Sequence, residues 1–255
     1  MTTSGDSEGS DAVSGLPGFA VTGVTPDERA AVASAMLIAM LAHDGENVAA
    51  MVPVETGIDE ACAAGSHGSL MRWAAGHLDD PRLVTPFAFE ADRSAIHAAD
   101  ASGTLLHSAA FDRARDELSN GRSIFIAHDA IGPLDPITPS LSMLDLFARW
   151  RLSVLIVDSV SRNAIAHVRL LGAACATRAI PVSGVLLTGA ASAVDFDDDA
   201  LSAICETLGA MLDCPVLIVP DVQSFHDRGE LLAAAASCDL RRVTHRRRPQ
   251  QPNTD

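Results

Sequence analysis

Short apolar runs alternate with helix-like stretches along most of this chain, and the alternation limits the possible folds more than any other feature. The runs lie at 19–23, 47–53, 83–89, 123–127, 153–158, 181–187 and 215–219. Several are continuously apolar, which is typical of strands buried on both faces. Because strands that alternate with helices pair in parallel, we predict a three-layer α/β fold with a mostly parallel sheet between helices.

Helix signals lie between the apolar runs. The stretch 27–43 follows Pro26 and opens with Asp27 and Glu28, and the macrodipole favours acids in a first helical turn. The stretch 104–120 has an apolar residue at every fourth position, with Thr104 as the expected N-cap. A third helix is predicted over 197–212, which opens with three aspartates.

Composition divides the chain into three parts. Residues 1–17 are rich in Ser, Gly and Asp and predict a disordered lead-in, residues 18–240 predict one α/β domain, and residues 241–255 predict an Arg-rich disordered tail. The lead-in has no apolar stretch of the kind found in a secretory signal, and no apolar run is long enough to span a membrane. We therefore expect a cytoplasmic protein.

The charge is acidic and unevenly distributed. The chain has a net charge of −15, and five of its 18 basic residues lie in 241–248. The rest would repel nucleic acids and anionic membranes, so we expect neither as a partner. The Arg-rich tail is either a solvated end or a contact for a polyanion or partner. The cysteines are scattered without metal-ligand spacing and are expected as reduced thiols, with no metal site: Cys62, Cys175, Cys205, Cys214 and Cys238.

The stretch AVTGVTPDERAAVASAML at 20–37 has the layout of a phosphate-binding turn: a strand, Gly23, a few polar residues and a long helix. A working turn of this kind needs glycines that expose backbone N–H groups, a Lys for the terminal phosphates and a hydroxyl for Mg²⁺. Arg29, Ala30 and Ala31 stand there instead, and the chain has no Lys anywhere. We interpret Gly23 and Thr25 as remnants of a nucleotide-binding turn, and Arg29 as either a substitute cation or a solvated helix-start residue.

Four later segments extend this pattern: VPVETG at 52–57, PFAFEADRSAIHAADASG at 86–103, AHDAIGPLDPI at 127–137 and LSVLIVDSVSRNAIAHVRLL at 152–171. In this order and spacing, over roughly 19–222, the chain resembles dethiobiotin synthetase. The resemblance implies a P-loop NTPase-like fold, a homodimer, and the use of ATP and Mg²⁺. It also implies a biotin-pathway reaction, in which 7,8-diaminononanoate is carboxylated and closed into a cyclic urea.

The family's functional positions are carried over by resemblance. Its charged and metal-binding groups fall on residues of other chemistry: the P-loop Lys on Ala30, the Thr on Ala31, a second Lys on Val52, a magnesium-binding Asp near Gly68 and a loop Glu on His128. Its smaller groups also change: two loop glycines become Asp129 and Ile131, the adenine-contacting Asn falls near Thr188, and a His becomes Ile96, next to His97. Three positions are kept, namely Thr56, Gly132 and His167, and Thr56 is predicted to line the substrate pocket.

The losses affect charged groups, whereas the apolar patterns of strands and helices persist. Packing requires volume and patterning, but phosphoryl transfer requires placed charges. We therefore expect a dethiobiotin synthetase-like protein with weak or no catalysis. The alternatives are a non-catalytic partner of an active biotin enzyme or paralogue, an enzyme with a phosphate site rebuilt from Arg29, Arg93 and His128, and a relative of cobyrinate amidases or partition ATPases.

Four positions have interpretations of their own. His128 and Asp129 form an acid/base pair, a weak metal site or a solvated loop pair. Asp158 either holds a metal or water, or is a strand-end carboxylate that caps the next helix near Ser161. His167 is expected to be a partly buried, hydrogen-bonded histidine in that helix.

Overall fold

A computed structural model describes residues 16–25, 28–76, 79–193 and 195–244. Its centre is a six-stranded sheet in the order β10-β9-β8-β1-β5-β2, in which every neighbouring pair is parallel. The strands are β1 (Gly18–Gly23), β2 (Val48–Met51), β5 (Ile124–His128), β8 (Ser153–Ser159), β9 (Val182–Thr188) and β10 (Val216–Ile218). The predicted fold class is confirmed.

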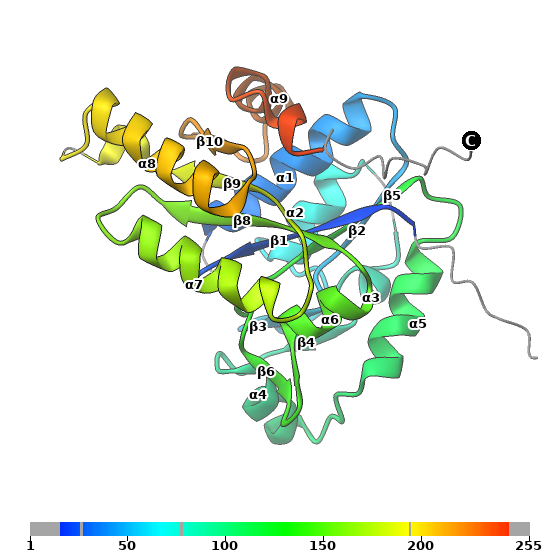
Figure 1. Ribbon diagram of the computed structural model, residues 1–255. Helices are drawn as coiled ribbons and strands as arrows, with labels where there is room; N and C mark the ends of the chain where they lie inside the picture. The colour runs from blue at the N-terminus through cyan, green and yellow to red at the C-terminus, as the bar shows by residue number, and fades with distance from the viewer. Residues whose placement is uncertain (1–15, 26–27, 77–78, 194, 245–255) are drawn as a thin grey trace, which may run out of the picture.

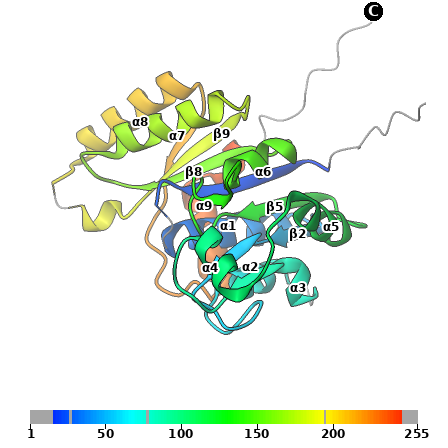
Figure 2. The ribbon, with the colours of Figure 1, turned by 90° about the horizontal axis from the view of Figure 1, so that it is seen from below.

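Helices cover both faces of this sheet. One face carries α1 (Glu28–His43), α2 (His67–Ala74) and α9 (Arg228–Ser237), and the other carries α5 (Ser108–Leu118), α6 (Met143–Arg149), α7 (Ala164–Ala176) and α8 (Asp198–Leu212). Figure 1 shows α1 and α9 on one side of the sheet, and Figure 2 shows α7 and α8 side by side. The alternation within β1 sets these layers, because Phe19 and Val21 pack under α1 while Ala20 faces the core with α7.

Smaller elements lie outside the six-stranded sheet. The short strands β3 (Val54–Thr56) and β4 (Phe87–Phe89) pair in parallel, and β6 (Pro136–Thr138) and β7 (Leu141–Ser142) pair antiparallel. The remaining elements are the helices α3 (Pro81–Val84) and α4 (Ala95–Ser102) and the 3₁₀ turns η1 (Ala190–Ser192) and η2 (Leu240–Val243).

Two predicted elements are wrong in position. The stretch 83–89 is not a single strand, because Asp80 caps α3 and Pro81 occupies its first turn, which leaves only Phe87–Phe89 extended. Thr104 is not an N-cap. Its N–H donates to the Ala99 carbonyl at the end of α4, and α5 begins later, with His107 as its cap.

The start of the predicted disordered tail is folded. Residues 241–244 continue through η2, where Val243 is 1% exposed, and Arg241 pairs with Asp44. The rest of the tail, and the lead-in up to residue 15, lie outside the described residues. Among the described helices, none has the length and apolarity needed to cross a lipid bilayer.

The order of the strands places the site. β1 lies between β5 and β8. The chain runs from β1 to β2 at one edge of the sheet, and from β8 to β9 and β10 at the opposite edge. In open α/β sheets, ligands bind at the carboxyl ends of the strands, where the strand order reverses. A ligand is therefore expected near the turn after β1 and the ends of β5 and β8.

Candidate functional site

The turn between β1 and α1 has the expected outline. β1 ends at Gly23 and α1 starts at Glu28, while Pro26 and Asp27 lie outside the described residues. A Cβ on Gly23 would lie 2.5 Å from the Thr25 carbonyl oxygen, so the close approach of the turn requires glycine there. Thr25 itself is exposed. A nucleotide contact by Gly23 or Thr25 stays a prediction.

Apolar side chains fill three positions where the resemblance places cations or a hydroxyl. Ala30 and Ala31, in the first turn of α1, are 0% and 1% exposed and belong to the core under that helix. Val52 is also fully buried, and its backbone N–H donates to the Val84 carbonyl. These three residues therefore contribute packing and offer no side-chain polar atom.

Arg29 points toward the β8 and β9 side of the sheet. Its Nη1 donates to the Ser159 hydroxyl over 2.8 Å, and its guanidinium lies beside Gly189, where a Cβ would be 3.8 Å away. Arg29 also lines a cavity of about 290 Å³ together with Thr188 and Val219. Thr188 is the position at which the resemblance places an adenine contact.

A second cavity, of about 450 Å³, opens on the other side of the start of α1. Thr56 and Arg93 line it, and a contact of Thr56 with a substrate stays a prediction. Among the described lining residues, the charged or titratable side chains are Glu28, Asp92, Asp135, Arg93 and His67. Three carboxylates thus line this cavity with one arginine, so its charge is acidic and does not favour the binding of phosphate.

The interpretation of His128 and Asp129 as a solvated loop pair is wrong. His128 is the last residue of β5 and is 0% exposed, and Asp129, which follows it, is 1% exposed. Their neighbour on β1 is Val21, which pairs with His128 in the sheet and accepts the Asp129 backbone N–H. The sheet register therefore buries His128 toward α1 and Asp129 on the opposite face of the sheet, beside Thr22.

Hydrogen bonds surround the Asp129 carboxylate. Oδ2 accepts from the Thr22 hydroxyl at 2.6 Å, and Oδ1 accepts from the backbone N–H groups of Ile131 and Gly132 at 3.1 and 2.9 Å. Burial raises the pKa of Asp129 to about 6, against the lowering effect of these hydrogen bonds. The backbone donors of this loop are thus already engaged by a side chain of the same loop.

His128 is the centre of a second buried chain. Its Nδ1 lies 2.9 Å from the Ser34 hydroxyl oxygen, and its Nε2 lies 2.9 Å from Nδ1 of His67. Burial lowers the pKa of His128 well below its ordinary value, and His67 adds to that lowering. His128 is therefore neutral near pH 7, and it connects α1 to α2 beneath the acidic cavity.

His67 is a candidate that the sequence did not single out. It is the first residue of α2, and the Glu55 carboxylate fixes that helix start by accepting from the backbone N–H groups of His67 and Gly68 at 2.6 and 3.0 Å. A Cβ on Gly68 would lie 2.1 Å from the Thr85 hydroxyl oxygen, so only glycine allows this packing. The resemblance pointed to Gly68, one residue away, and that was the one available signal.

Asp158 and His167 lie together at the end of β8. Asp158 Oδ2 is 3.3 Å from Nδ1 of His167, whose side chain is 38% exposed, so the predicted partial burial of His167 is confirmed and its hydrogen bond stays a prediction. The helix α7 begins at Ala164 with Asn163 as its N-cap, and Asp158 reaches it through His167. His97, expected next to a lost family histidine, contacts the Ser94 hydroxyl oxygen at 2.8 Å.

Metal-ligating and thiol groups do not gather elsewhere. Within the described ranges, no three His, Cys, Asp or Glu side chains are placed to hold a metal ion. All five cysteines lie in these ranges and are free thiols. Burial raises the pKa of Cys175 to about 11, which makes it an unreactive core residue.

The fold and the turn after β1 define an α/β protein of the P-loop type, a class whose members generally bind ATP and Mg²⁺. The AAA domain family (AAA_26) matches residues 18–224, and the chain belongs to this family.

Two relatives are named ATP-dependent dethiobiotin synthetase BioD. The protein from Novosphingobium aromaticivorans is 29% identical over 192 residues, covering 74% of this chain and 82% of its own length. The protein from Caulobacter sp. is 27% identical over 228 residues, covering 87% and 96%. The chain is thus a distant relative of dethiobiotin synthetases over most of its length.

A solved structure supports the fold alone. The ParA family ATPase from Chlorobium tepidum superimposes with a TM-score of 0.50 at 11% identity and covers 88% of this chain and 92% of its own. At that identity, the likeness carries no information about activity.

Proposed function

We propose that this protein is a dethiobiotin synthetase-like member of the AAA domain family that has no normal ATP turnover. The site residues support this reading through what they offer to an anion. A triphosphate site needs free backbone N–H groups, a placed cation and a hydroxyl or carboxylate for Mg²⁺.

The proposal depends most on the loop after β5, whose backbone N–H groups are hydrogen-bonded to a carboxylate of the same loop. The N–H groups of Ile131 and Gly132, which could face an anion, donate to the Asp129 carboxylate instead. A phosphate oxygen would have to displace a buried carboxylate from these donors. Leaving a buried charged group without its partners costs several kcal/mol, so the exchange is unfavourable.

The acidic cavity adds charge repulsion. Glu28, Asp92 and Asp135 line it against Arg93 alone among the described residues. At about 4 Å, like charges near a protein surface repel by roughly 4 kcal/mol at an effective dielectric constant of about 20. Carboxylates suit Mg²⁺, but Arg93 is the one arginine among the described lining residues that could face the phosphates. The cavity therefore does not fit a magnesium–triphosphate group, and we derive no phosphoryl-transfer step.

Arg29, Arg93 and His128, the residues expected to form a rebuilt phosphate site, do not lie in a common cavity. Arg29 lines the 290 Å³ cavity and Arg93 the 450 Å³ cavity, while His128 is buried behind α1. A single phosphate could not contact all three in this arrangement, which favours the inactive reading over the rebuilt enzyme.

The test is calorimetric titration of the full chain with Mg–ATP, followed by an assay with 7,8-diaminononanoate, bicarbonate and ATP. We expect no saturable heat up to millimolar nucleotide and no cyclic urea product above the uncatalysed background. The Novosphingobium relative, purified and assayed under the same conditions, is the positive control. Micromolar binding of ATP, or product formed at a rate close to that of the control, would overturn the proposal.

A second role, as a non-catalytic partner, draws on two exposed side chains. Leu105 and Leu170 are 79% and 70% exposed, and we take them as the apolar side chains available to contact another protein surface, either a second copy or a paralogue. Light scattering across a concentration series should give a dimer mass, and Leu105→Ser or Leu170→Ser should shift it toward the monomer. A monomer at all concentrations would remove the homodimer and leave only the paralogue.

A further inference from the structure

The cavity of 450 Å³ has a histidine whose tautomer can be worked out from its neighbours. His67 lines this cavity, and its Nδ1 contacts the buried His128. Behind His128 lie Ser34 and the Ala30 carbonyl, so four residues form one hydrogen-bonded chain from the helix backbone to the cavity. The direction of this chain decides which nitrogen of His67 carries the proton.

The chain begins at Ser34. Its hydroxyl lies 3.0 Å from the Ala30 carbonyl oxygen and donates its single proton there. If the proton pointed to His128 instead, two acceptor oxygens would face each other at 3.0 Å with no hydrogen between them. The Ser34 oxygen therefore accepts from His128, and the proton of His128 lies on Nδ1.

The next step fixes His67. A neutral imidazole has one N–H, and His128 is neutral because burial lowers its pKa. With its proton on Nδ1, the Nε2 atom of His128 is an acceptor, so the 2.9 Å contact is donated by Nδ1–H of His67. Neutral His67 then has no proton on Nε2, and that atom keeps its lone pair.

We propose that Nε2 of His67 is the proton acceptor of this cavity, for a ligand that presents an N–H or O–H group. The proton leaves the ligand and binds to Nε2, and the imidazolium so formed keeps its Nδ1–H bond to His128. No other proton has to move, and no co-reactant is needed. Ser34, His128 and Glu55 act as positioning residues, because they orient His67 without facing the ligand.

The surroundings fit a donor and disfavour an anion. The charged and titratable groups around His67 come from α1, β3, β5 and the loops after β4 and before β6, and they are Glu28, Glu55, His128, Asp92, Arg93 and Asp135. Most are carboxylates, which attract a cationic ligand or one that donates hydrogen bonds. The inference does not depend on the absence of ATP turnover, because the tautomer follows from the buried chain.

Long-range ¹⁵N–¹H correlation spectra of the histidine rings test the tautomer directly. We expect the His67 signal, assigned by its loss in His67→Gln, to show the Nδ1–H form in the neutral ring. Ser34→Ala removes the acceptor for His128 and should raise the Nε2–H population of His67. The matched control Ser183→Ala, which removes a buried hydroxyl bonded to the Val154 carbonyl, should leave His67 unchanged. An Nε2–H form in the wild type, or no response to Ser34→Ala, would overturn the assignment.

The same spectra test the ligand class with methylammonium and inorganic phosphate as separate probes. We expect methylammonium to shift the His67 ring signals in a saturable way and phosphate at equal ionic strength to leave them in place. A phosphate response alone, or no response to either probe, would overturn the ligand class. The tautomer result and the ATP titration are read independently, so their failures are distinguishable.

Discussion

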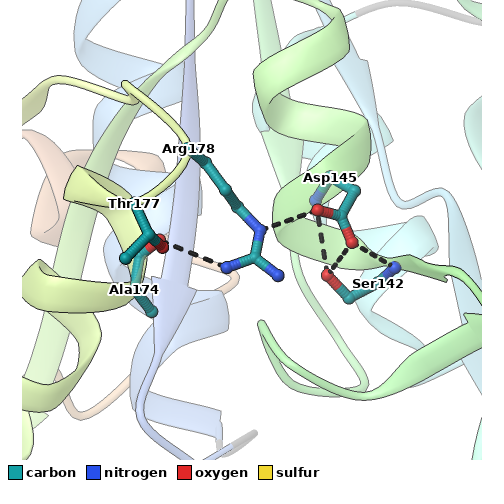
Figure 3. A network of polar contacts seen from close by, with 5 residues as sticks. All are labelled: Ser142, Asp145, Ala174, Thr177 and Arg178. Atoms are coloured by element: carbon teal, nitrogen blue, oxygen red, sulfur yellow. Dashed lines mark hydrogen bonds and ion pairs between the residues drawn. The ribbon is translucent and has the colours of Figure 1, made fainter.

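Two aspartates with opposite behaviour show how this fold uses carboxylates. Asp129 lies beside Thr22 at the end of β1 and is 1% exposed, takes its hydrogen bonds from neutral groups, and has a pKa raised to about 6. Asp145 lies at the start of α6, where its carboxylate accepts from Ser142 and from Nε of Arg178 at 2.7 Å (Figure 3). Burial alone would raise the pKa of Asp145, but the bonds from Arg178 and Ser142 outweigh it and lower that pKa.

The difference comes from solvent and from charge. Arg178 supplies a cation that compensates the Asp145 charge at the surface, and the capping box with Ser142 satisfies the helix start. Asp129 is buried among neutral donors, so its ionised form is costly. The partly exposed network of Asp145, Ser142 and Arg178 therefore stabilises the fold when Asp145 is ionised. The buried Asp129 belongs to the candidate site, and its burial favours the neutral carboxyl.

The largest expected effect is the pH dependence caused by Asp129. Its folded pKa of about 6 exceeds the ordinary 3.8, so its stabilising effect is present below pH 3.8 and is lost as the pH rises through about 6. Relative to Asp129→Asn, the free energy of unfolding of the wild type should fall by about 3 kcal/mol over this window. Urea unfolding measured across the window gives the difference.

Asp145→Asn is the control with the opposite sign. The folded pKa of Asp145 is lowered, so its contribution is present above the ordinary value and is lost as the pH falls through the folded one. The difference in unfolding free energy between the wild type and Asp145→Asn should therefore rise with pH, whereas the difference for Asp129→Asn should fall. The contrast between the two carboxylates is refuted if both differences change with pH in the same direction.

The next effect comes from packing at the start of α2. Gly68→Ala places a Cβ against the buried Thr85 hydroxyl and should destabilise the fold by about 1–3 kcal/mol. It should also displace His67, which a change in the His67 ring signals would report. Thermal unfolding measures the loss of stability.

Gly209→Ala is the matched control, because a Cβ added to this helical glycine in α8 would have no neighbour closer than 3.5 Å. Alanine there should be neutral or stabilising by up to about 1 kcal/mol. Equal destabilisation by both substitutions would show that the contact with Thr85 is not the cause.

The smallest effect is expected in the exposed network. Arg178→Gln removes a partly exposed ion pair and should cost about 0.2–1 kcal/mol near pH 7, less at high salt. The cost should shrink as the pH falls and Asp145 becomes protonated. Arg149→Gln, which removes the pair with Asp112, is the comparable surface substitution. If Arg178→Gln lowered the free energy of unfolding by several kcal/mol, the Arg178–Asp145 pair would behave like a buried interaction and the comparison would fail.

Part of the candidate site could be predicted from the sequence. The strand-end Gly23 and the apolar pair Ala30 and Ala31 follow from local spacing, whereas Thr56, which lines a cavity, was singled out by the resemblance. The burial of His128 and Asp129 could not be predicted, because a polar pair after a strand has the same local pattern in a solvated loop. The local signals around Asp80 and Pro81 also outweighed the apolar run at 83–89.

By itself, the sequence determined the layered α/β architecture and the loss of the phosphate-binding groups from the first helical turn. Both depend on local periodicity and residue type. Only the tertiary structure decided that Ser34, His67 and His128 form one chain, because α1, α2 and β5 meet there through the strand order and the Glu55 contact with α2. The side chains in contact lie 94 and 61 positions apart and share no local pattern, so their contact arises from packing alone.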